Sequence, residues 1–225
     1  MAILKRTSSI TADGGIKCLI YGHSGAGKTF LASTLQNPLI ISAESGLLSL
    51  SGFDFPYIEA NSIDSLRSAY EFCTSPESAG FDIVLDSISE ISEVVLSAEK
   101  KATKDPRQAY GATQEKTLEI VRLFRDIQGK NVVFIAKCEK AQDEHGRLLY
   151  SPMLTGSKLG QQLPYFFDLV MPLRVEQTAD GHHYRVLQTD SDGLWQAKNR
   201  ANGRLDMWEK PDLSNIFNKI KGANQ

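Results

Sequence analysis

Short apolar runs alternate with longer amphipathic stretches along most of this chain. The apolar runs predict buried strands at residues 16–21, 39–42, 82–86, 132–137 and 168–173. Apolar positions at helical spacing predict helices at residues 28–35, 62–74, 88–101 and 110–128. Strands and helices that alternate in this way indicate a mostly parallel sheet with helices on both faces.

The pattern changes in the last quarter of the chain. Residues 183–188 and 194–198 predict an antiparallel pair, preceded by the turn signal Asp180-Gly181, and residues 213–220 predict a closing helix. The predicted fold class is therefore α/β, with a mostly parallel central sheet flanked by helices and a C-terminal antiparallel hairpin extension. We expect an N-terminal extension at residues 1–15 and one core domain at residues 16–225.

The segment between the first predicted strand and helix carries the most specific motif. It reads Gly22-His23-Ser24-Gly25-Ala26-Gly27-Lys28-Thr29 and fits G-x-x-x-x-G-K-[ST], the phosphate-binding P-loop. Its glycines let backbone N–H groups turn toward phosphate oxygens, and the following helix N-terminus adds a favourable dipole. We expect Lys28 to reach the β- and γ-phosphates and Thr29 to hold Mg²⁺. The motif predicts binding of a nucleoside triphosphate, with ATP and Mg²⁺ as the cofactors.

Two acids follow predicted strands and extend this site. Asp86 ends the strand at 82–86 and is expected to hold the Mg²⁺ shell, although an ordinary helix cap after a strand is the alternative. Glu44 follows the strand at 39–42. Because the carboxyl ends of parallel strands line the ligand crevice, Glu44 is a candidate to deprotonate the water that attacks the γ-phosphate. The alternative for Glu44 is a solvated side chain that opens the next helix.

The order of these segments resembles the RecA-like recombinase ATPases, most of all the short, core-only forms encoded by bacteriophages. The P-loop, Ser42-Ala43-Glu44 and Val84-Leu85-Asp86-Ser87 occur in the family's order. The resemblance implies that Glu44 is the catalytic glutamate. Serine after Asp86 disfavours the AAA+ type, in which a glutamate directly follows the aspartate. The resemblance also implies a DNA-dependent ATPase that acts on single-stranded DNA in recombination or strand annealing, with a single-strand-binding protein as a further partner.

Lys137 stands at the end of a strand that resembles the RecA strand carrying the γ-phosphate sensor. The family has a polar amide at that position, so the sensor chemistry differs here. Lys137 either contacts phosphate directly or pairs with Glu139 or Glu144.

Residues 138–159 form a long predicted loop whose position is similar to that of the RecA loop that grips single-stranded DNA. Four residues in it are candidates for DNA contact: Lys140, Arg147, Tyr150 and Lys158. The cations would follow the phosphates while Tyr150 stacks on a base. The alternative is a β-hairpin flap with solvated cations, which three nearby acids favour: Glu139, Asp143 and Glu144.

Lys198 and Arg200 form a basic pair near the predicted C-terminal hairpin. RecA-like proteins carry a similar pair that reaches the ATP of the next subunit, so the resemblance implies that these two cations neutralise charge on the transferring phosphate in trans. Hydrolysis would then require a homo-oligomer, either a filament or a ring. The alternative is a solvated basic turn.

Composition limits the remaining choices. The chain has 225 residues, of which 41% are hydrophobic and 23% charged, and this suits a single globular domain. A net charge of −2 gives no bulk support for nucleic-acid binding, so DNA contact must come from local basic patches. No apolar run reaches about 18 residues, so we expect no membrane span. Three scattered cysteines suit core thiols in a reducing cytoplasm.

Two other function classes share the P-loop. One is a nucleotide or small-molecule kinase, for which Arg107 is a candidate lid residue, although Glu44 and Asp86-Ser87 argue against it. The other is a non-catalytic nucleotide-dependent switch that binds a protein partner.

Overall fold

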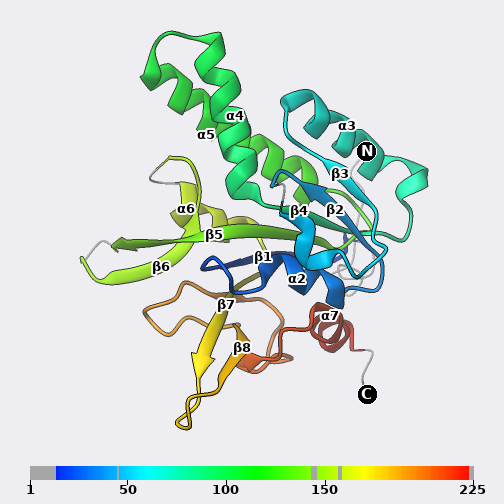
Figure 1. Ribbon diagram of the computed structural model, residues 1–225, viewed down its shortest axis with the longest axis vertical. Coiled ribbons are helices and arrows are strands. Elements are labelled where there is room, and N and C mark those ends of the chain that lie inside the picture. Colours follow the sequence, from blue (N-terminus) through cyan, green and yellow to red (C-terminus); the bar gives the residue numbers. More distant parts are fainter. Residues whose placement is uncertain (1–13, 45, 143–145, 157–158, 223–225) are drawn as a thin grey trace, which may run out of the picture.

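The computed structural model describes residues 14–44, 46–142, 146–156 and 159–222. Six strands form the parallel centre of one sheet in the order β7-β1-β5-β4-β2-β3. Their bounds are Leu169–Gln177 (β7), Lys17–Gly22 (β1), Val132–Gln142 (β5), Asp82–Asp86 (β4), Pro38–Ser42 (β2) and Tyr57–Glu59 (β3). The predicted α/β fold class is confirmed (Figure 1).

Four further strands pair antiparallel at the margins of this sheet. They are β6 (Leu148–Met153) on β5, β8 (His183–Gln188) and β9 (Lys198–Asn199) on β7, and β10 (Trp208–Glu209) on β8. The turn at Asp180-Gly181 joins β7 to β8, and Gly181 has a φ of 90°, a conformation that favours glycine. Strands β6 and β8 pair with the outer parts of β5 and β7, the two strands that flank β1, which carries the P-loop at its end.

Helices cover both faces of the sheet and produce two separate cores. One face is covered by α3 (Ile63–Thr74), α4 (Ile88–Ala102), α5 (Pro106–Arg125) and α6 (Leu159–Gln162), and the other by α2 (Lys28–Leu31) and α7 (Leu213–Lys221). Strand β1 shows why both faces need cover, because Leu19 and Tyr21 enter the first core while Cys18 and Ile20 enter the second. All four side chains are fully buried, as expected for a central parallel strand.

Local signals explain where the long helices begin. The hydroxyl of Ser62 caps α3, that of Ser87 caps α4, and the carboxylate of Asp105 caps α5, each by accepting a backbone N–H bond. Pro106 follows as the first residue of α5, where its missing N–H costs no helical bond. The cap at Ser87 is important for the site, because it starts α4 directly after Asp86.

Two predictions about strands are wrong. Residues 194–198 do not pair with residues 183–188: β8 pairs with the end of β7, which runs to Gln177, and Lys198–Asn199 pair with the start of β7. Residues 138–159 are not mainly a loop, because β5 continues to Gln142 and β6 returns along it, as in the hairpin alternative. In both cases a strand is longer than its apolar run, since its outer half carries polar, exposed side chains.

The predicted N-terminal extension lies almost wholly outside the described residues, which begin at residue 14. Within the described part of the chain, none of the helices combines the length and apolar character needed to cross a bilayer.

Candidate nucleotide-binding site

The P-loop connects β1 to α2 at the carboxyl end of the sheet, and its glycines meet steric demands of the backbone. Gly25 and Gly27 have φ values of 78° and 95°, which side chains rarely adopt. A Cβ at Gly22 would lie 2.5 Å from the carbonyl oxygen of Leu173 on the neighbouring strand β7. These positions therefore need glycine, independently of any ligand.

Lys28, the first residue of α2, folds back across the mouth of this loop. Its ammonium group donates hydrogen bonds of 2.9 Å to the carbonyl oxygens of Gly22 and His23. Burial lowers the pKa of Lys28, while the carboxylates of Asp86 and Glu44 act in the opposite direction. The cation thus lies against the P-loop, within the field of both acids; its contact with phosphate stays a prediction.

Thr29 and Asp86 meet as the motif predicts. The Thr29 hydroxyl donates a 2.6 Å hydrogen bond to Oδ2 of Asp86. Asp86 is only 4% exposed, and burial raises its pKa although the bond from Thr29 opposes the shift. A hydroxyl that donates to a carboxylate keeps its lone pairs free for a cation, so this pair fits Mg²⁺, which binds few protein oxygens and completes its shell with water and phosphate.

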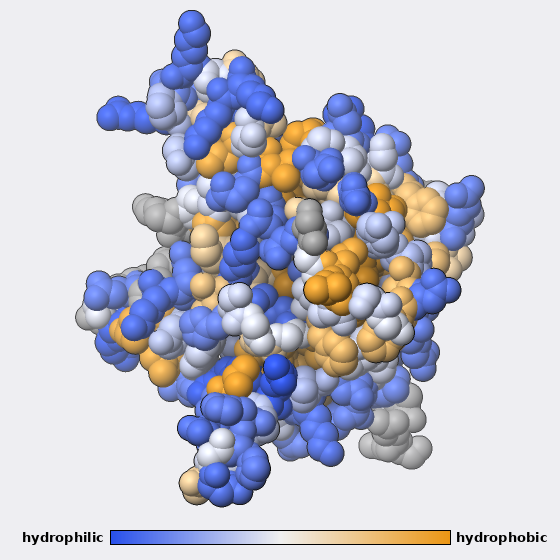
Figure 2. Space-filling view, in the orientation of Figure 1, coloured by the Kyte–Doolittle hydropathy of each residue, from blue (hydrophilic) through white to orange (hydrophobic). Residues whose placement is uncertain are grey.

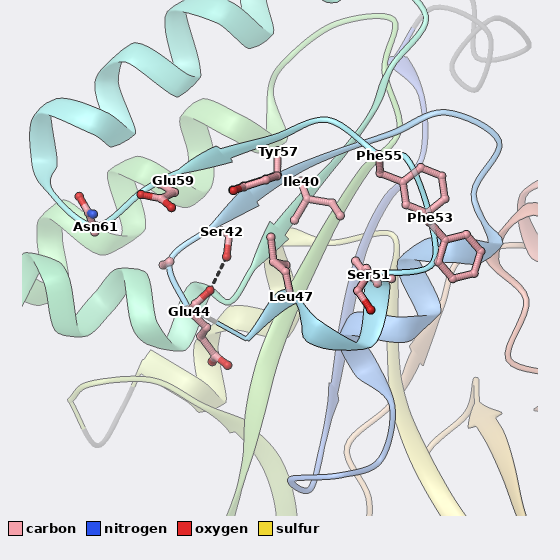
Figure 3. Close-up of a pocket in the computed structure, with 12 residues that line it drawn as sticks. Ile40, Ser42, Glu44, Leu47, Ser51, Phe53, Phe55, Tyr57, Glu59 and Asn61 are labelled. Carbon is pink, nitrogen blue, oxygen red and sulfur yellow. Dashed lines mark hydrogen bonds between the residues drawn. The ribbon is translucent and has the colours of Figure 1, made fainter.

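Glu44 lies beside this pair because β2 and β4 are neighbours, with Ser42 in register with Asp86. The Ser42 hydroxyl donates to the main-chain oxygen of Glu44 at 2.5 Å (Figure 3). The Ser87 hydroxyl donates to the carboxylate oxygen Oε1 at 2.7 Å. The side chain of Glu44 remains 35% exposed, so a positioned carboxylate with access to water lies next to the predicted phosphate site.

Glu44 also forms a boundary between two hollows. One, of about 490 Å³, is lined by the P-loop with Lys28, Asp86 and Lys137. The other, of about 340 Å³, lies over β2 and β3, with the stacked rings of Phe53 and Phe55 at one end (Figure 3). Glu44 lines both hollows, and the first of them places it on the same cavity as the P-loop.

Lys137 lies between the loop and the acids because β5 separates β1 from β4, with Lys137 opposite Gly22. Its ammonium group is paired with Glu90 of α4 and lies 3.8 Å from Oε1 of Glu44. The bond with Glu90 raises the pKa of Lys137, and partial burial opposes it. The predicted partner Glu139 is therefore wrong, and Glu144 lies outside the described residues. A contact between Lys137 and phosphate stays a prediction.

Arg185 reaches the P-loop from β8, although no motif in the sequence indicates it. Its Nε donates a 2.8 Å hydrogen bond to the carbonyl oxygen of Ala26, and a Cβ at Gly27 would lie 3.2 Å from the same nitrogen. Among the described residues, Arg185 forms no ion pair with an acid, so its positive charge is uncompensated beside the loop. No local motif signals this contact, because it joins residues 159 positions apart.

An aromatic cluster connects the P-loop to the β5–β6 hairpin. The ring of Tyr150 stacks on Trp195 with centroids 4.3 Å apart, and His23 lies edge-on to both, at 5.4 Å and 5.5 Å. The ammonium group of Lys140 lies 5.9 Å from the centre of the Tyr150 ring. The stacking of Trp195 thus occupies one face of the Tyr150 ring, and contact between Tyr150 and a base stays a prediction. Arg147 lies near the hairpin turn, and Lys158 is outside the described residues.

Lys198 and Arg200 lie at the opposite end of the sheet from the P-loop. Strand β9 pairs with Leu169 and Val170 at the start of β7, whereas the P-loop follows the carboxyl end of the parallel strand β1. Lys198 donates to the carbonyl of Pro164 at 3.0 Å, and Arg200 lies 3.8 Å from Asp168. Neither cation belongs to the site of its own chain, so a role at phosphate requires a second copy.

Comparison with known proteins gives one family match and several distant structural ones. A family model described as an AAA domain matches residues 14–201. No curated protein matches the sequence. A KaiC-like protein from Pyrococcus horikoshii OT3 is 14% identical with a TM-score of 0.43, over 80% of this chain and 83% of that one. An ATPase from the type III secretion system of pathogenic bacteria is 11% identical with a TM-score of 0.48, over 74% of this chain and 54% of that one.

Proposed function

This chain belongs to the AAA-domain family, and we propose that within it the protein is an oligomeric ATPase that acts on single-stranded DNA. That it is a nucleotide-binding P-loop ATPase follows from the family and from the site. The role in recombination or strand annealing, and a place among the core-only phage recombinases, are our proposals from the resemblance. The serine after Asp86 argued against the AAA+ type and did not point to this family. Its hydroxyl instead bonds to Glu44, the acid that follows the neighbouring strand β2.

The position of Glu44 is the observation that supports ATP hydrolysis most directly. Its carboxylate accepts from Ser87 at 2.7 Å and lies on the same hollow as Lys28 and Asp86. We assign it the removal of a proton from the attacking water. Lys28 and the N–H groups of the loop would stabilise charge on the transferring phosphate. Thr29 and Asp86 would hold Mg²⁺, which when bound would neutralise negative charge on the phosphates.

The proposed contact with single-stranded DNA is supported by the β5–β6 hairpin. It presents Lys140 and Arg147, and its Tyr150 belongs to the cluster that contacts His23 of the P-loop. A DNA strand that moved this hairpin would therefore change the packing around the phosphate-binding loop. This connection offers a physical route by which DNA would stimulate ATP hydrolysis.

The proposed oligomer is supported by the separation of Lys198 and Arg200 from their own P-loop. In a head-to-tail assembly, the end of the sheet that carries them would face the P-loop end of the next copy. We further propose that residues 1–15 form an extension to a core at 16–225 and that a single-strand-binding protein is a partner. The free thiols of the three cysteines fit a reducing cytoplasm.

The deciding experiment measures ATP hydrolysis with Mg²⁺ in the presence and absence of single-stranded DNA. We expect DNA to raise the rate and Lys28→Ala to abolish turnover in both cases. Transfer of phosphate to an added nucleoside or nucleotide would identify a kinase instead. Negligible turnover under all conditions would identify a nucleotide-dependent switch.

A second measurement tests the hairpin. The combined change of Arg147, Tyr150 and Lys158 to alanine should weaken binding of single-stranded DNA. An unchanged affinity would refute the role of this hairpin while leaving the ATPase assignment in place.

A further inference from the structure

The α4–α5 helical hairpin projects from the body of the protein and ends in a strongly basic tip. Helix α4 ends at Ala102, and α5 begins at Pro106. Figure 1 shows the two helices extending together beyond the sheet, and Figure 2 shows hydrophilic side chains over the projecting end. The tip, defined here as residues 100–107, contains no apolar side chain larger than alanine or proline. Nothing in its packing therefore explains why it extends so far.

Four cations crowd this tip: Lys100, Lys101, Lys104 and Arg107. All four are exposed, and within the described part of the chain none of them forms an ion pair. The acid inside the tip, Asp105, accepts the backbone N–H of Arg107 at 2.9 Å as the cap of α5. Glu99, just before the tip, is buried and bonded to Lys116 at 2.5 Å. The positive charge of the tip is thus uncompensated in a chain of net charge −2.

Building on the proposed function, we infer that this tip is a second contact surface for single-stranded DNA, at which the four cations bind the phosphate backbone. The tip is more basic than residues 138–159, which contain the outer part of the β5–β6 hairpin. Residues 138–159 hold three Lys or Arg and three Asp or Glu, whereas the tip holds four cations and one acid. Phosphate contacts dominate the affinity of proteins for nucleic acids, so the tip is the stronger electrostatic candidate.

Tyr110 favours a nucleic acid over an acidic protein as the occupant. Its ring is 42% exposed on the first turns of α5, and the Lys100 ammonium lies 5.4 Å from the ring centre. An exposed ring flanked by cations suits a strand whose bases stack while its phosphates pair with the charges.

Helix α4 connects the tip to the β5–β6 hairpin, because its residues form hydrogen bonds with the segment that follows β6. The Ser92 hydroxyl lies 2.9 Å from that of Thr155, which follows β6, and Thr155 donates to Glu93 at 2.6 Å. Since α4 starts next to Asp86 and rises about 1.5 Å per residue, its far end lies roughly 20 Å from the nucleotide site. One DNA strand could therefore contact both hairpins, while the tip takes no part in hydrolysis itself.

The test replaces all four cations by glutamine, which keeps helix propensity, and follows binding of a fluorescent oligonucleotide across salt concentrations. Each lost phosphate contact should reduce the slope of log K against log salt by about 0.7, so we expect a slope smaller by up to about 3 and at least tenfold weaker binding. The control is Arg67→Gln, Lys210→Gln and Lys221→Gln, which removes three exposed cations from other parts of the chain, so its slope should change less than that of the tip variant. Thermal unfolding of each variant checks that the fold is kept.

Tyr110→Ala provides an independent measurement. It should weaken binding without changing the salt slope, because it removes stacking and no charge. If the wild-type protein binds the oligonucleotide and the glutamine variant binds with the same affinity and slope, the inference about the tip is overturned and the proposed function stands. If the wild-type protein does not bind single-stranded DNA at all, both fail.

Discussion

Ser87 donates a 2.7 Å hydrogen bond to Oε1 of Glu44, across the ends of two neighbouring strands. The same hydroxyl accepts the backbone N–H of Glu90 and caps α4. One serine thus starts the helix after Asp86 and orients the carboxylate that follows strand β2. Ser87, the residue directly after Asp86, therefore has a structural role in the site.

Glu44→Gln should leave nucleotide binding nearly intact, since glutamine has a similar shape and can still accept the bond from Ser87. It should lower kcat by a factor on the order of 10² or more, because the amide cannot take a proton from water. Steady-state hydrolysis and equilibrium nucleotide binding, measured on the same preparation, separate the two effects. A rate within a few-fold of wild type would mean that another group positions the water.

Arg185→Ala should raise KM for ATP by on the order of tenfold with a smaller effect on kcat. The change leaves the Ala26 carbonyl without its side-chain donor, and bonds from charged groups contribute about 1.5–3 kcal/mol. Arg185→Lys should recover part of the loss, since it keeps the charge without the planar fork. His183→Ala, an exposed change on the same face of β8, is the control. Equal KM values for Arg185→Ala and wild type would contradict a positioning role.

Trp195 should report nucleotide binding by its fluorescence. The chain has two tryptophans, so Trp208→Phe leaves Trp195 as the only indole. The ring centroid of Trp195 lies 5.5 Å from that of His23, which is a residue of the P-loop. Any shift of the P-loop therefore alters the surroundings of the indole. Titration with ATP and Mg²⁺ should change the emission, and His23→Ala should reduce the change. Constant emission at saturating ATP would show that the loop does not move against Trp195.

Lys17 should make the protein more stable as pH rises from 8 to 10.5. Burial lowers the pKa of Lys17 from 10.5 to about 8, and the ammonium donates to the carbonyls of Ile127 and Lys130. Between these pH values the unfolded chain binds more protons than the folded one, so the free energy of unfolding increases with pH. Below pH 8, Lys17 is protonated in both the folded and the unfolded state, so the free energy of unfolding gains nothing from it.

The measurement for Lys17 compares wild type with Lys17→Met in urea unfolding at pH 7 and pH 10. Other titrating groups affect both proteins equally, so the difference between them isolates Lys17. We expect this difference to shift in favour of wild type by on the order of 2 kcal/mol. A difference that stays constant with pH would show that the pKa of Lys17 is the same in both states.

Local patterns in the sequence were enough to predict the P-loop, its flanking strand and helix, and the acids Glu44 and Asp86. The P-loop occupies consecutive residues, and the positive φ values of Gly25 and Gly27 impose a residue type that is visible without a structure. The parallel sheet followed from buried strands that alternate with amphipathic helices. Because parallel strands share one carboxyl edge, the two acids and the loop had to meet there.

Only the tertiary structure decided how distant segments pair. The outer halves of β5 and β7 are mostly polar, so the sequence did not show that these strands continue and pair with β6 and β8. Likewise, Arg185 reaches Ala26, and Lys137 selects Glu90 over Glu139, through contacts between separate elements. A residue's own neighbours in sequence determine its local conformation, but which backbone edge or charge it meets depends on how the whole sheet closes.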